Sequence, residues 1–524
     1  FFEENKEWLI NYAAFCYLRD ENKTPIFGNW KKFSVYKASE IAKLVDPKSA
    51  HYDKIAIHYF IQYHLDKQLK ESKVYADEKK IAFKGDIPIG ISPNSVEAWA
   101  EPHLFNMNAQ AGAPPDDFSA TGQNWGFPTY NWEEMAKDGY LWWRKRFAKM
   151  SSYFNAYRID HILGFFRIWE IPKDSVQGLL GHFNPALPFS HHDLELRGFH
   201  FNYERHARPF IRHYMLIEIF GVYVDEVIEH FLSSNVWEVY HLKPEFDTQL
   251  KIEKHFEGKT SDKDIWIRDG LYGLINEVLF VEDPQHHGRF HPRIAAHFTY
   301  SYRNMSEYDR WKYDHLYVDF FYHRHNHFWG EQAMHKLPAL VNSTNMLCCA
   351  EDLGMIPDCV PAVMHNMQIL SLEIQRMPKD SKVQFGNTYH YPYLSVCTTS
   401  THDMSTNRGW WEDNRALAQN FFNNILLEWG EAPYYCEPWI AERILVHHLN
   451  SPSMLSIFPL QDLLAIDGGI RRDNPQEEQI NVPANPKHYW RYRMHLTVEE
   501  LLKANEFNSK IRKLIQDSGR DSAN

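Results

Sequence analysis

The chain has 524 residues, of which 44% are hydrophobic and 24% charged, and this composition is ordinary for a globular protein. At this length we expect one large α/β domain with insertions, or two domains. The net charge of −12 argues against a nucleic-acid partner, because such binding depends on clustered Lys and Arg. The sequence contains no run of about 20 apolar residues, which is the length needed to span a bilayer, so membrane insertion is not expected.

Five short β-branched or aromatic runs are each followed by a stretch with helical periodicity, which is the βα alternation of a parallel sheet. Each run ends near an acid, and the runs cover residues 81–86, 156–160, 346–351, 394–403 and 455–462. Active sites of (β/α)₈ barrels lie at the C-terminal ends of the strands, so repeated acids there favour a barrel. The alternative is that each acid caps the helix that follows it.

Three further segments carry information about architecture. Ile57, Ile61, Leu65 and Leu69 recur every four residues and predict one face of an amphipathic helix that covers the sheet. A long segment at 173–340 separates two strand ends and contains helical stretches such as 212–232, so we interpret it as an inserted subdomain. The polar tail at 516–524 has no apolar period and is expected to be frayed.

The first chemical motif places Arg158 and Asp160 two residues apart, hence on the same side of a strand. A carboxylate beside a guanidinium stays ionised at neutral pH, as a nucleophile toward an anomeric carbon requires. The competing interpretation is a purely structural Arg–Asp pair. Glu351 ends a second strand and is a candidate for the second carboxyl that retaining glycoside chemistry needs. Asp403 ends a third, where it would hydrogen-bond the hydroxyls of the donor sugar.

The motifs RIDH at 158–161, AEDLG at 350–354 and THD at 401–403 together resemble the retaining α-glucan barrels. Further blocks narrow the resemblance to the amylomaltase or 4-α-glucanotransferase family, glycoside hydrolase family 77. These blocks are GDIPIG at 85–90, GAPPD at 112–116, GQNWG at 122–126 and INVP at 480–483. The resemblance implies an α/β fold, specifically a (β/α)₈ TIM barrel, and it runs from about Trp8 to Leu514.

By this resemblance Asp160 is the nucleophile, Glu351 the general acid/base and Asp403 the stabiliser of the transition state. The positions expected to bind substrate are Arg158, His402, Asp86, Asp116, Gln123, Trp125 and Asn481. For Trp125 the alternative is a core Trp in a Gly-flanked turn, and for Asn481 a turn residue before Pro483. The implied substrates are maltose, malto-oligosaccharides and a branched α-glucan such as glycogen.

The chain departs from the compact members of the family in two ways. Asp160 and Glu351 lie 191 positions apart, which resembles the branch containing the cytosolic plant disproportionating enzyme. The early catalytic blocks of the family lie upstream of anything matching Phe1, so the barrel is expected to be N-terminally truncated. We therefore predict the first part of the barrel at 1–172, a mostly helical inserted subdomain at 173–340, and the second part at 341–515.

No cofactor or metal is expected. The six cysteines show neither metal-ligand spacing nor the density of a disulfide scaffold, and with the family they favour a cytoplasmic location. His323, His325 and His327 alternate, but the aromatic residues around them suggest a packed or sugar-facing element rather than a metal site. A loop bounded by Pro and Gly holds three further histidines that are predicted to be solvated, namely His286, His287 and His291.

Three functions remain in competition. A transferase and a glucan hydrolase share the glycosyl-enzyme and differ in whether a sugar hydroxyl or water attacks it. The amylomaltase-type blocks favour the transferase. A non-catalytic glucan-binding protein is disfavoured because all three carboxylates, Asp160, Glu351 and Asp403, are present.

Overall fold

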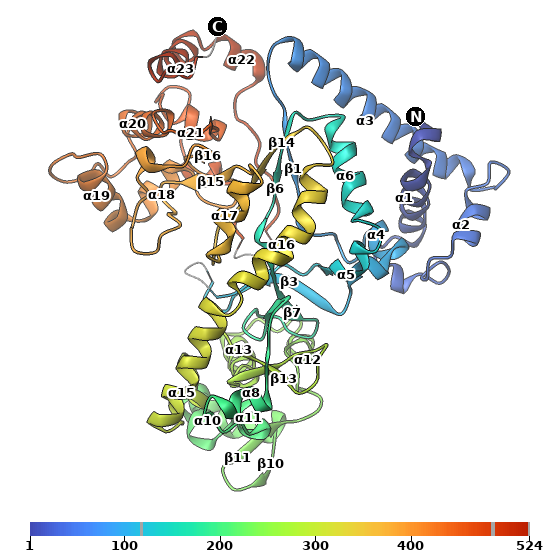
Figure 1. Cartoon of the computed structure of the whole chain (residues 1–524), viewed down its shortest axis with the longest axis vertical. Coiled ribbons are helices and arrows are strands. Elements are labelled where there is room, and N and C mark those ends of the chain that lie inside the picture. The colour runs from blue at the N-terminus through green and yellow to red at the C-terminus, as the bar shows by residue number, and fades with distance from the viewer. Residues whose placement is uncertain (116–118, 484–487, 522–524) are drawn as a thin grey trace. The chain divides into compact units, whose positions relative to one another are not determined.

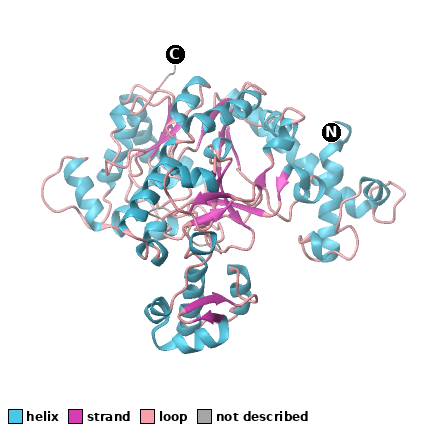
Figure 2. Cartoon of the chain, turned by 60° about the horizontal axis from the view of Figure 1, so that its bottom comes forward, coloured by secondary structure: helices cyan, strands magenta, loops and turns pink. Residues whose placement is uncertain are grey.

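The computed structural model describes residues 1–115, 119–483 and 488–521. The chain folds into two compact units. The first consists of 1–155, 163–346 and 357–360, and the second of 156–162, 347–356 and 361–524. Helices and short sheets alternate along the chain (Figures 1 and 2), so the fold class is α/β, as predicted.

The first unit opens with three helices, α1 (Phe2–Asn22), α2 (Ala38–Leu44) and α3 (Tyr52–Glu78). They enclose a core that includes Leu9 and Trp30. The predicted helix at 57–69 lies within α3, but its predicted buried face was wrong. Ile57, Ile61, Leu65 and Leu69 are 36–52% exposed, whereas Ile55 and Tyr59 are buried. Because each residue turns the helix by about 100°, position 57 points away from the face that Ile55 presents to α1.

The first unit also contains an antiparallel sheet of four strands in the order β4-β3-β7-β8, and the last of these strands lies within 173–340. Its strands are β3 (Ala109–Ala113), β4 (Gln123–Asn124), β7 (Ile168–Pro172) and β8 (His182–Asn184). Around it lie β1 (Lys84–Ile87), α4 (Val96–Ala100), β2 (Phe105–Asn106), β5 (Thr129–Tyr130), α5 (Trp132–Ala136), α6 (Leu141–Ser151) and α7 (Leu163–Phe166). Strand β1 continues one residue beyond Asp86, so this acid lies inside the strand and not at its end, where the run 81–86 predicts it.

The segment 173–340 belongs to the first unit and contains mostly helices. Its first half has β9 (Phe189–Ser190), α8 (His191–Leu196), α9 (Tyr203–His206), α10 (His213–Phe220), α11 (Val224–Phe231), the hairpin β10 (Leu232–Val236) and β11 (Val239–Leu242), and α12 (Gln249–His255). Its second half has α13 (Asp262–Ile275), β12 (Phe280–Glu282), β13 (Arg289–Pro292), α14 (Tyr300–Arg303), α15 (Glu307–Val318) and α16 (Asn326–Val341). Helices α10 to α13 gather around their own core (Figure 1). The predicted helical stretch 212–232 is broken at Gly221, whose φ is 53°.

The second unit is built on parallel strands. β6 (Ala156–Ile159) pairs with β14 (Leu347–Ala350), β15 (Ser371–Ile374) pairs with β16 (Ser395–Thr398), and β16 pairs with β17 (Leu455–Ser456). A parallel bridge from Cys349 to Leu370 joins the two groups. The order β6-β14-β15-β16-β17 therefore brings the carboxyl ends of five strands to the same edge.

Helices cover this arc of strands and complete the second unit. They are most of α17 (Cys359–Asn366), α18 (Asn407–Asp413), α19 (Arg415–Asn424), α20 (Pro438–Leu449), α21 (Leu460–Leu464), α22 (Val498–Lys503) and α23 (Asn505–Asp517). Trp411, Phe421 and Ile444 lie at the centre of their core. The tail at 516–524 was expected to be frayed, but α23 continues to Asp517. Arg520 then donates to the carbonyls of Leu449, Ser451 and Ser453 at 2.6–2.8 Å. Residues 522–524 lie outside the described residues.

Candidate active site

Asp160 follows the last residue of β6, and Arg158 lies within that strand. The Arg158 guanidinium is 2.9 Å from the Asp160 carboxylate, and the Asp160 side chain is 33% exposed. The alternation of side chains along a strand places both on one side, as the sequence predicted. The arrangement gives a carboxylate that is paired with a guanidinium and partly open to solvent.

Glu351 follows β14, the parallel neighbour of β6. Its carboxylate accepts hydrogen bonds from the backbone N–H groups of His161 at 2.9 Å and Leu353 at 2.8 Å. Burial, and next the negative charge of Asp160, raise the pKa of Glu351 to about 7. A carboxyl that keeps its proton near neutrality, beside a second carboxyl that is paired with a guanidinium, has the chemistry that an acid and nucleophile pair requires.

The backbone at His161 has a left-handed conformation with φ of 46°. A side chain other than glycine in this region costs about 1–3 kcal/mol and persists where the surroundings enforce it. Here the turn aims the N–H of His161 at the Glu351 carboxylate, while Ile162 N–H donates to the Glu351 carbonyl at 2.9 Å. The strained turn therefore fixes the ends of β6 and β14 to one another.

Asp403 lies in the loop that follows β16. His402 Nε2 is 3.0 Å from one of its carboxylate oxygens, and Asn481 Nδ2 donates to the other at 2.7 Å. Burial alone would raise the pKa of Asp403, but these hydrogen bonds outweigh it and hold the pKa below its ordinary value. The charge of Arg158 acts in the same direction. Asp403 is therefore kept ionised, and Asn481 is more than a turn residue before Pro483.

The loop between β16 and α18 is fastened by Asp462, which is buried in α21. Its carboxylate accepts from the hydroxyls of Thr399 at 2.6 Å and Ser400 at 2.5 Å, and from the N–H of Asn407 at 2.9 Å. The sequence pattern predicts Asp462 as one of the five acids that end strands. The structure places it inside a helix instead, as an anchor of the loop that carries Asp403.

The second unit thus holds Arg158, Asp160, Glu351, His402, Asp403 and Asn481, and the first unit holds three other predicted residues. Asp86 is exposed on β1. Trp125 is half-buried and not a core residue. Its indole N–H donates to Gln123 at 3.1 Å and its ring stacks on Phe127 with centroids 5.8 Å apart. Asp116 lies outside the described residues.

The prediction for His291 was wrong, because it lies buried in β13 and not in a solvated loop. His291 Nε2 is 3.0 Å from Asp283, and its ring is 4.5 Å from that of His182, which in turn lies 3.9 Å from Glu170. We call Glu170, His182, Asp283 and His291 the histidine cluster. Three consecutive residues of β13, from Phe290 to Pro292, are buried, whereas His286 and His287 precede the strand and are exposed.

The alternating histidines also have individual roles. His325 is buried, and its two ring nitrogens contact the Phe320 carbonyl at 2.7 Å and the Leu187 N–H at 2.9 Å. His327 is exposed and lies 3.2 Å from Glu331. Within 1–115, 119–483 and 488–521, no three His, Cys, Asp or Glu side chains form a group that could hold a metal ion.

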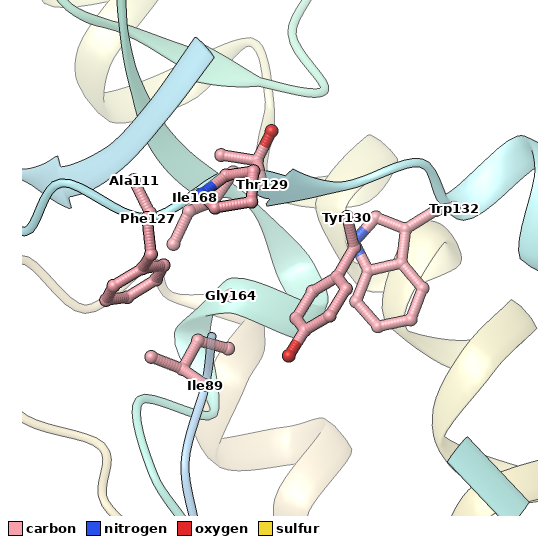
Figure 3. A pocket seen from close by; sticks show the side chains of 9 residues that line it. Ile89, Ala111, Phe127, Thr129, Tyr130, Trp132, Gly164 and Ile168 are labelled. Atoms are coloured by element: carbon pink, nitrogen blue, oxygen red, sulfur yellow. The ribbon is translucent and has the colours of Figure 1, made fainter. Parts of the chain in front are cut away.

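A small apolar cavity lies in the first unit, lined by Ile89, Phe127, Tyr130, Trp132 and Gly164 among others (Figure 3). Its volume of about 10 Å³ has room for about one water molecule. It is too small for a glucosyl unit. Among residues 1–115, 119–483 and 488–521, no helix is long and apolar enough to cross a membrane.

Two polar groups that support the site belong to no sequence motif. Lys379 contacts both Asp352 at 2.7 Å and Glu373 at 2.8 Å beneath the AEDLG turn. Arg408 and Glu478 form an ion pair buried in the second unit. The local sequence gives no signal for such a pair, because α18 has the sequence NRGWWED and carries two further charged residues besides Arg408.

Comparison with known proteins identifies the family of this chain. The family model described as 4-alpha-glucanotransferase matches residues 1–497. This chain therefore belongs to the 4-alpha-glucanotransferase family, glycoside hydrolase family 77.

Among individual relatives, the rice protein 4-alpha-glucanotransferase DPE2 (Oryza sativa subsp. japonica) is 43% identical over 99% of this chain and 55% of its own length. The 4-alpha-glucanotransferase of Chlamydia pneumoniae is 24% identical over 98% of this chain and 70% of its own. The chain thus spans little more than half of the rice relative.

Among solved structures, an amylomaltase from Streptococcus agalactiae in complex with acarbose superposes with a TM-score of 0.61 at 18% identity. The match covers 99% of this chain and 73% of that one. At this identity the likeness shows the fold alone, and the fold is that of the amylomaltases.

Proposed function

We propose that this chain is a retaining 4-α-glucanotransferase that moves glucosyl units from maltose or malto-oligosaccharides to an α-glucan acceptor such as glycogen. The observation that carries the proposal is the pairing of Asp160 and Glu351 at the carboxyl ends of two adjacent parallel strands, with the pKa of Glu351 raised to about 7. Membership of the family supports it independently.

In the first half-reaction the Asp160 carboxylate attacks the anomeric carbon of the donor, and the bond to the leaving 4-oxygen breaks. Glu351 gives its proton to that oxygen and becomes a carboxylate. The ionised Asp403 stabilises the positive charge that develops on the sugar ring and holds its hydroxyls. Arg158, 2.9 Å from Asp160, keeps the nucleophile charged until attack.

In the second half-reaction the 4-hydroxyl of the acceptor attacks the anomeric carbon. Glu351 takes the hydroxyl proton, the ester bond breaks, and the Asp160 carboxylate is regenerated. Water competes with the acceptor for the same intermediate. Transfer prevails where the acceptor is held in place, because orientation raises its effective molarity above that of water.

The residues proposed to bind the glucan are Arg158 and His402 beside the reacting bond, and Asp86, Asp116, Gln123, Trp125 and Asn481 along the chain of sugars. Trp125 supports such a role, because its half-buried ring offers a flat face of the kind on which sugar rings stack. We further propose that the five parallel strands belong to a (β/α)₈ barrel and that 173–340 forms an inserted lobe that shapes specificity. A cytoplasmic location accords with six cysteines that lack the density of a disulfide scaffold.

The alternative is an α-glucan hydrolase with the same carboxylates. The test is to incubate the protein with maltose and glycogen and to follow glucose and total reducing ends. A transferase releases glucose while the number of reducing ends stays constant, since each bond broken is replaced. If reducing ends rise in step with glucose, the protein is a hydrolase.

A further inference from the structure

A buried ion pair lies behind the segment that carries Asn481. Arg408 in α18 and Glu478 in the short helix 475–478 are 2.7 Å apart and only 3% and 2% exposed. The Arg408 guanidinium also donates to the carbonyls of Arg472 at 2.6 Å and Asp473 at 3.2 Å. Thr406 donates to the second carboxylate oxygen of Glu478 at 3.1 Å. These contacts tie the segment at 472–478 to the start of α18.

The hydrogen bonds continue from Glu478 to Asp403. Gln461 donates to the Glu478 carbonyl at 3.1 Å, so the backbone is held just before it reaches Asn481. There the Asn481 N–H donates to the carbonyl of His402 at 3.1 Å, and the Asn481 side chain donates to Asp403 at 2.7 Å. The ion pair is therefore three residues from a direct contact with a proposed catalytic carboxylate.

Stability alone is a poor explanation for this pair. Taking two charges out of water costs several kcal/mol, and apolar residues of similar volume often stabilise a fold equally well. A charge pair does supply fixed directions, because the planar guanidinium holds several acceptors at once. Asp403 needs such support, since it lies in a loop with its side chain 40% exposed, and a displacement of about 1 Å at a reacting centre costs roughly 100-fold in rate.

We propose that Arg408 and Glu478 are positioning residues for Asp403, acting through Asn481. The ion pair fixes the backbone at 478–481, and Asn481 fixes the direction and the charge of the Asp403 carboxylate. This inference rests on the proposed function, because it gives Asp403 a part in glucosyl transfer.

The neighbouring Glu477 provides a matched control. It forms an ion pair with Arg472 at 2.7 Å, but its side chain is 57% exposed. The substitutions Glu477→Gln and Glu478→Gln change adjacent residues in the same chemical way. They differ in whether the lost charge is buried beside the segment that holds Asn481.

The experiment compares Glu478→Gln, Asn481→Ala and Glu477→Gln in transfer from maltose to glycogen. We expect kcat to fall roughly 10- to 100-fold in the first two variants, and no change in the third. The KM for maltose should stay within about twofold of wild type in Glu478→Gln, whereas in Asn481→Ala it should also rise, because Asn481 is proposed to bind the glucan. The acidic limb of the pH profile should move to higher pH in the first two variants, because Asp403 loses a hydrogen bond that lowers its pKa. A merely structural role would change stability without moving this limb.

Since Glu478→Gln leaves a buried guanidinium unpaired, thermal unfolding is measured for every variant. Should it fail to fold, the double variant Arg408→Met with Glu478→Met removes both charges and keeps the volume. The inference is overturned if a folded Glu478 variant, single or double, keeps wild-type kcat and pH profile while Asn481→Ala loses activity. Absence of transfer by the wild-type protein would instead reject the proposed function itself.

Discussion

Two clusters of this molecule place acids beside histidines, and they differ in their access to solvent. The first is the carboxylate cluster of Asp160, Glu351 and Asp403, in which the side chains of Asp160 and Asp403 are 33% and 40% exposed. The second is the histidine cluster, in which the side chains of His182 and His291 are only 6% and 1% exposed. One has an open side toward solvent, and the other is sealed.

The electrostatics of the two clusters also run in opposite directions. Burial and the charge of Asp160 raise the pKa of Glu351 to about 7, so a proton is available there near neutrality. Burial lowers the pKa of His291 to about 4, so that ring stays neutral. Asp283 beside it is satisfied by the N–H groups of Gln285 and His286, each at 2.8 Å. A buried acid close to a histidine is therefore no sign of catalysis unless a proton and an open side accompany it.

The largest expected effect is that of Asp160→Asn. A carboxamide cannot form the glycosyl ester, so transfer should fall by roughly 10³-fold or more. The thermal unfolding midpoint should stay close to that of wild type, because Asp160 is partly exposed. The measurement is the initial rate of glucose release from maltose with glycogen present. Activity of a few per cent, after mass spectrometry has excluded deamidation, would contradict the assignment.

The matched change in the histidine cluster is Asp283→Asn, for which the opposite outcome is expected. The Asp283 carboxylate contacts His291 and accepts from the N–H groups of Gln285 and His286, and weakening such hydrogen bonds to a charged group costs about 1.5–3 kcal/mol in the free energy of unfolding. The kcat for transfer at 25 °C should remain within about twofold of wild type. Urea unfolding and steady-state kinetics check the two halves of this prediction. A loss of kcat with unchanged stability would give the sealed cluster a catalytic part.

The two clusters should also respond oppositely to pH. Glu351 has a folded pKa above its ordinary 4.5, so its contribution to stability is present below pH 4.5 and is lost as the pH rises through about 7. This amounts to about 3 kcal/mol. His291 has a folded pKa below 6.5, so its contribution is present above pH 6.5 and is lost as the pH falls through about 4.

Two variants separate these contributions. The two contributions have opposite slopes and their windows overlap, so each variant removes one slope and uncovers the other. Glu351→Gln should make stability rise more steeply with pH between about 4.5 and 7 than in wild type, and His291→Gln should make it fall more steeply with pH between about 4 and 6.5. Urea unfolding at several pH values measures both. If Glu351→Gln keeps the full wild-type slope in its window, the pKa of Glu351 is not raised in the folded protein.

The smallest expected effect is that of Trp125→Ala. Stacking of a sugar on the indole is worth about 1 kcal/mol, so the KM for malto-oligosaccharides should rise about fivefold with little change in kcat. Phe127→Ala, which removes the ring beneath Trp125, should have a weaker effect of the same kind. A fall in kcat with unchanged KM would place Trp125 in the chemistry and not in binding.

Sequence reasoning predicted the parts of the fold that depend on local pattern. The strands that end before Asp160 and Glu351 and the pairing of Arg158 with Asp160 follow from alternation along a strand. Sequence reasoning failed where contacts between distant parts of the chain decide which side chains are buried. The face of α3 that is buried is set by α1, and the buried His291 contacts Asp283, which follows the neighbouring strand β12. Neither contact can be inferred from the residues that are adjacent in the sequence.

The candidate site shows the same division. The carboxylates carry motifs and were found, whereas the groups that orient them are scattered single residues. Asp462 holds a loop more than 50 residues away in sequence, and Arg408 reaches Glu478 across 70 positions. Such long-range contacts follow from the order of the parallel strands, which no single segment of sequence specifies.

The most direct test of the central claim follows the fate of the glucosyl group on Asp160. With maltose as donor and glycogen as acceptor, glucose and total reducing ends are counted in the same samples over time. We expect glucose to accumulate while the total of reducing ends stays constant, and both glucose release and chain lengthening to vanish in Asp160→Asn. A gain of one reducing end for every two glucose molecules released, as hydrolysis of maltose gives, or transfer that persists in Asp160→Asn, would contradict the proposal.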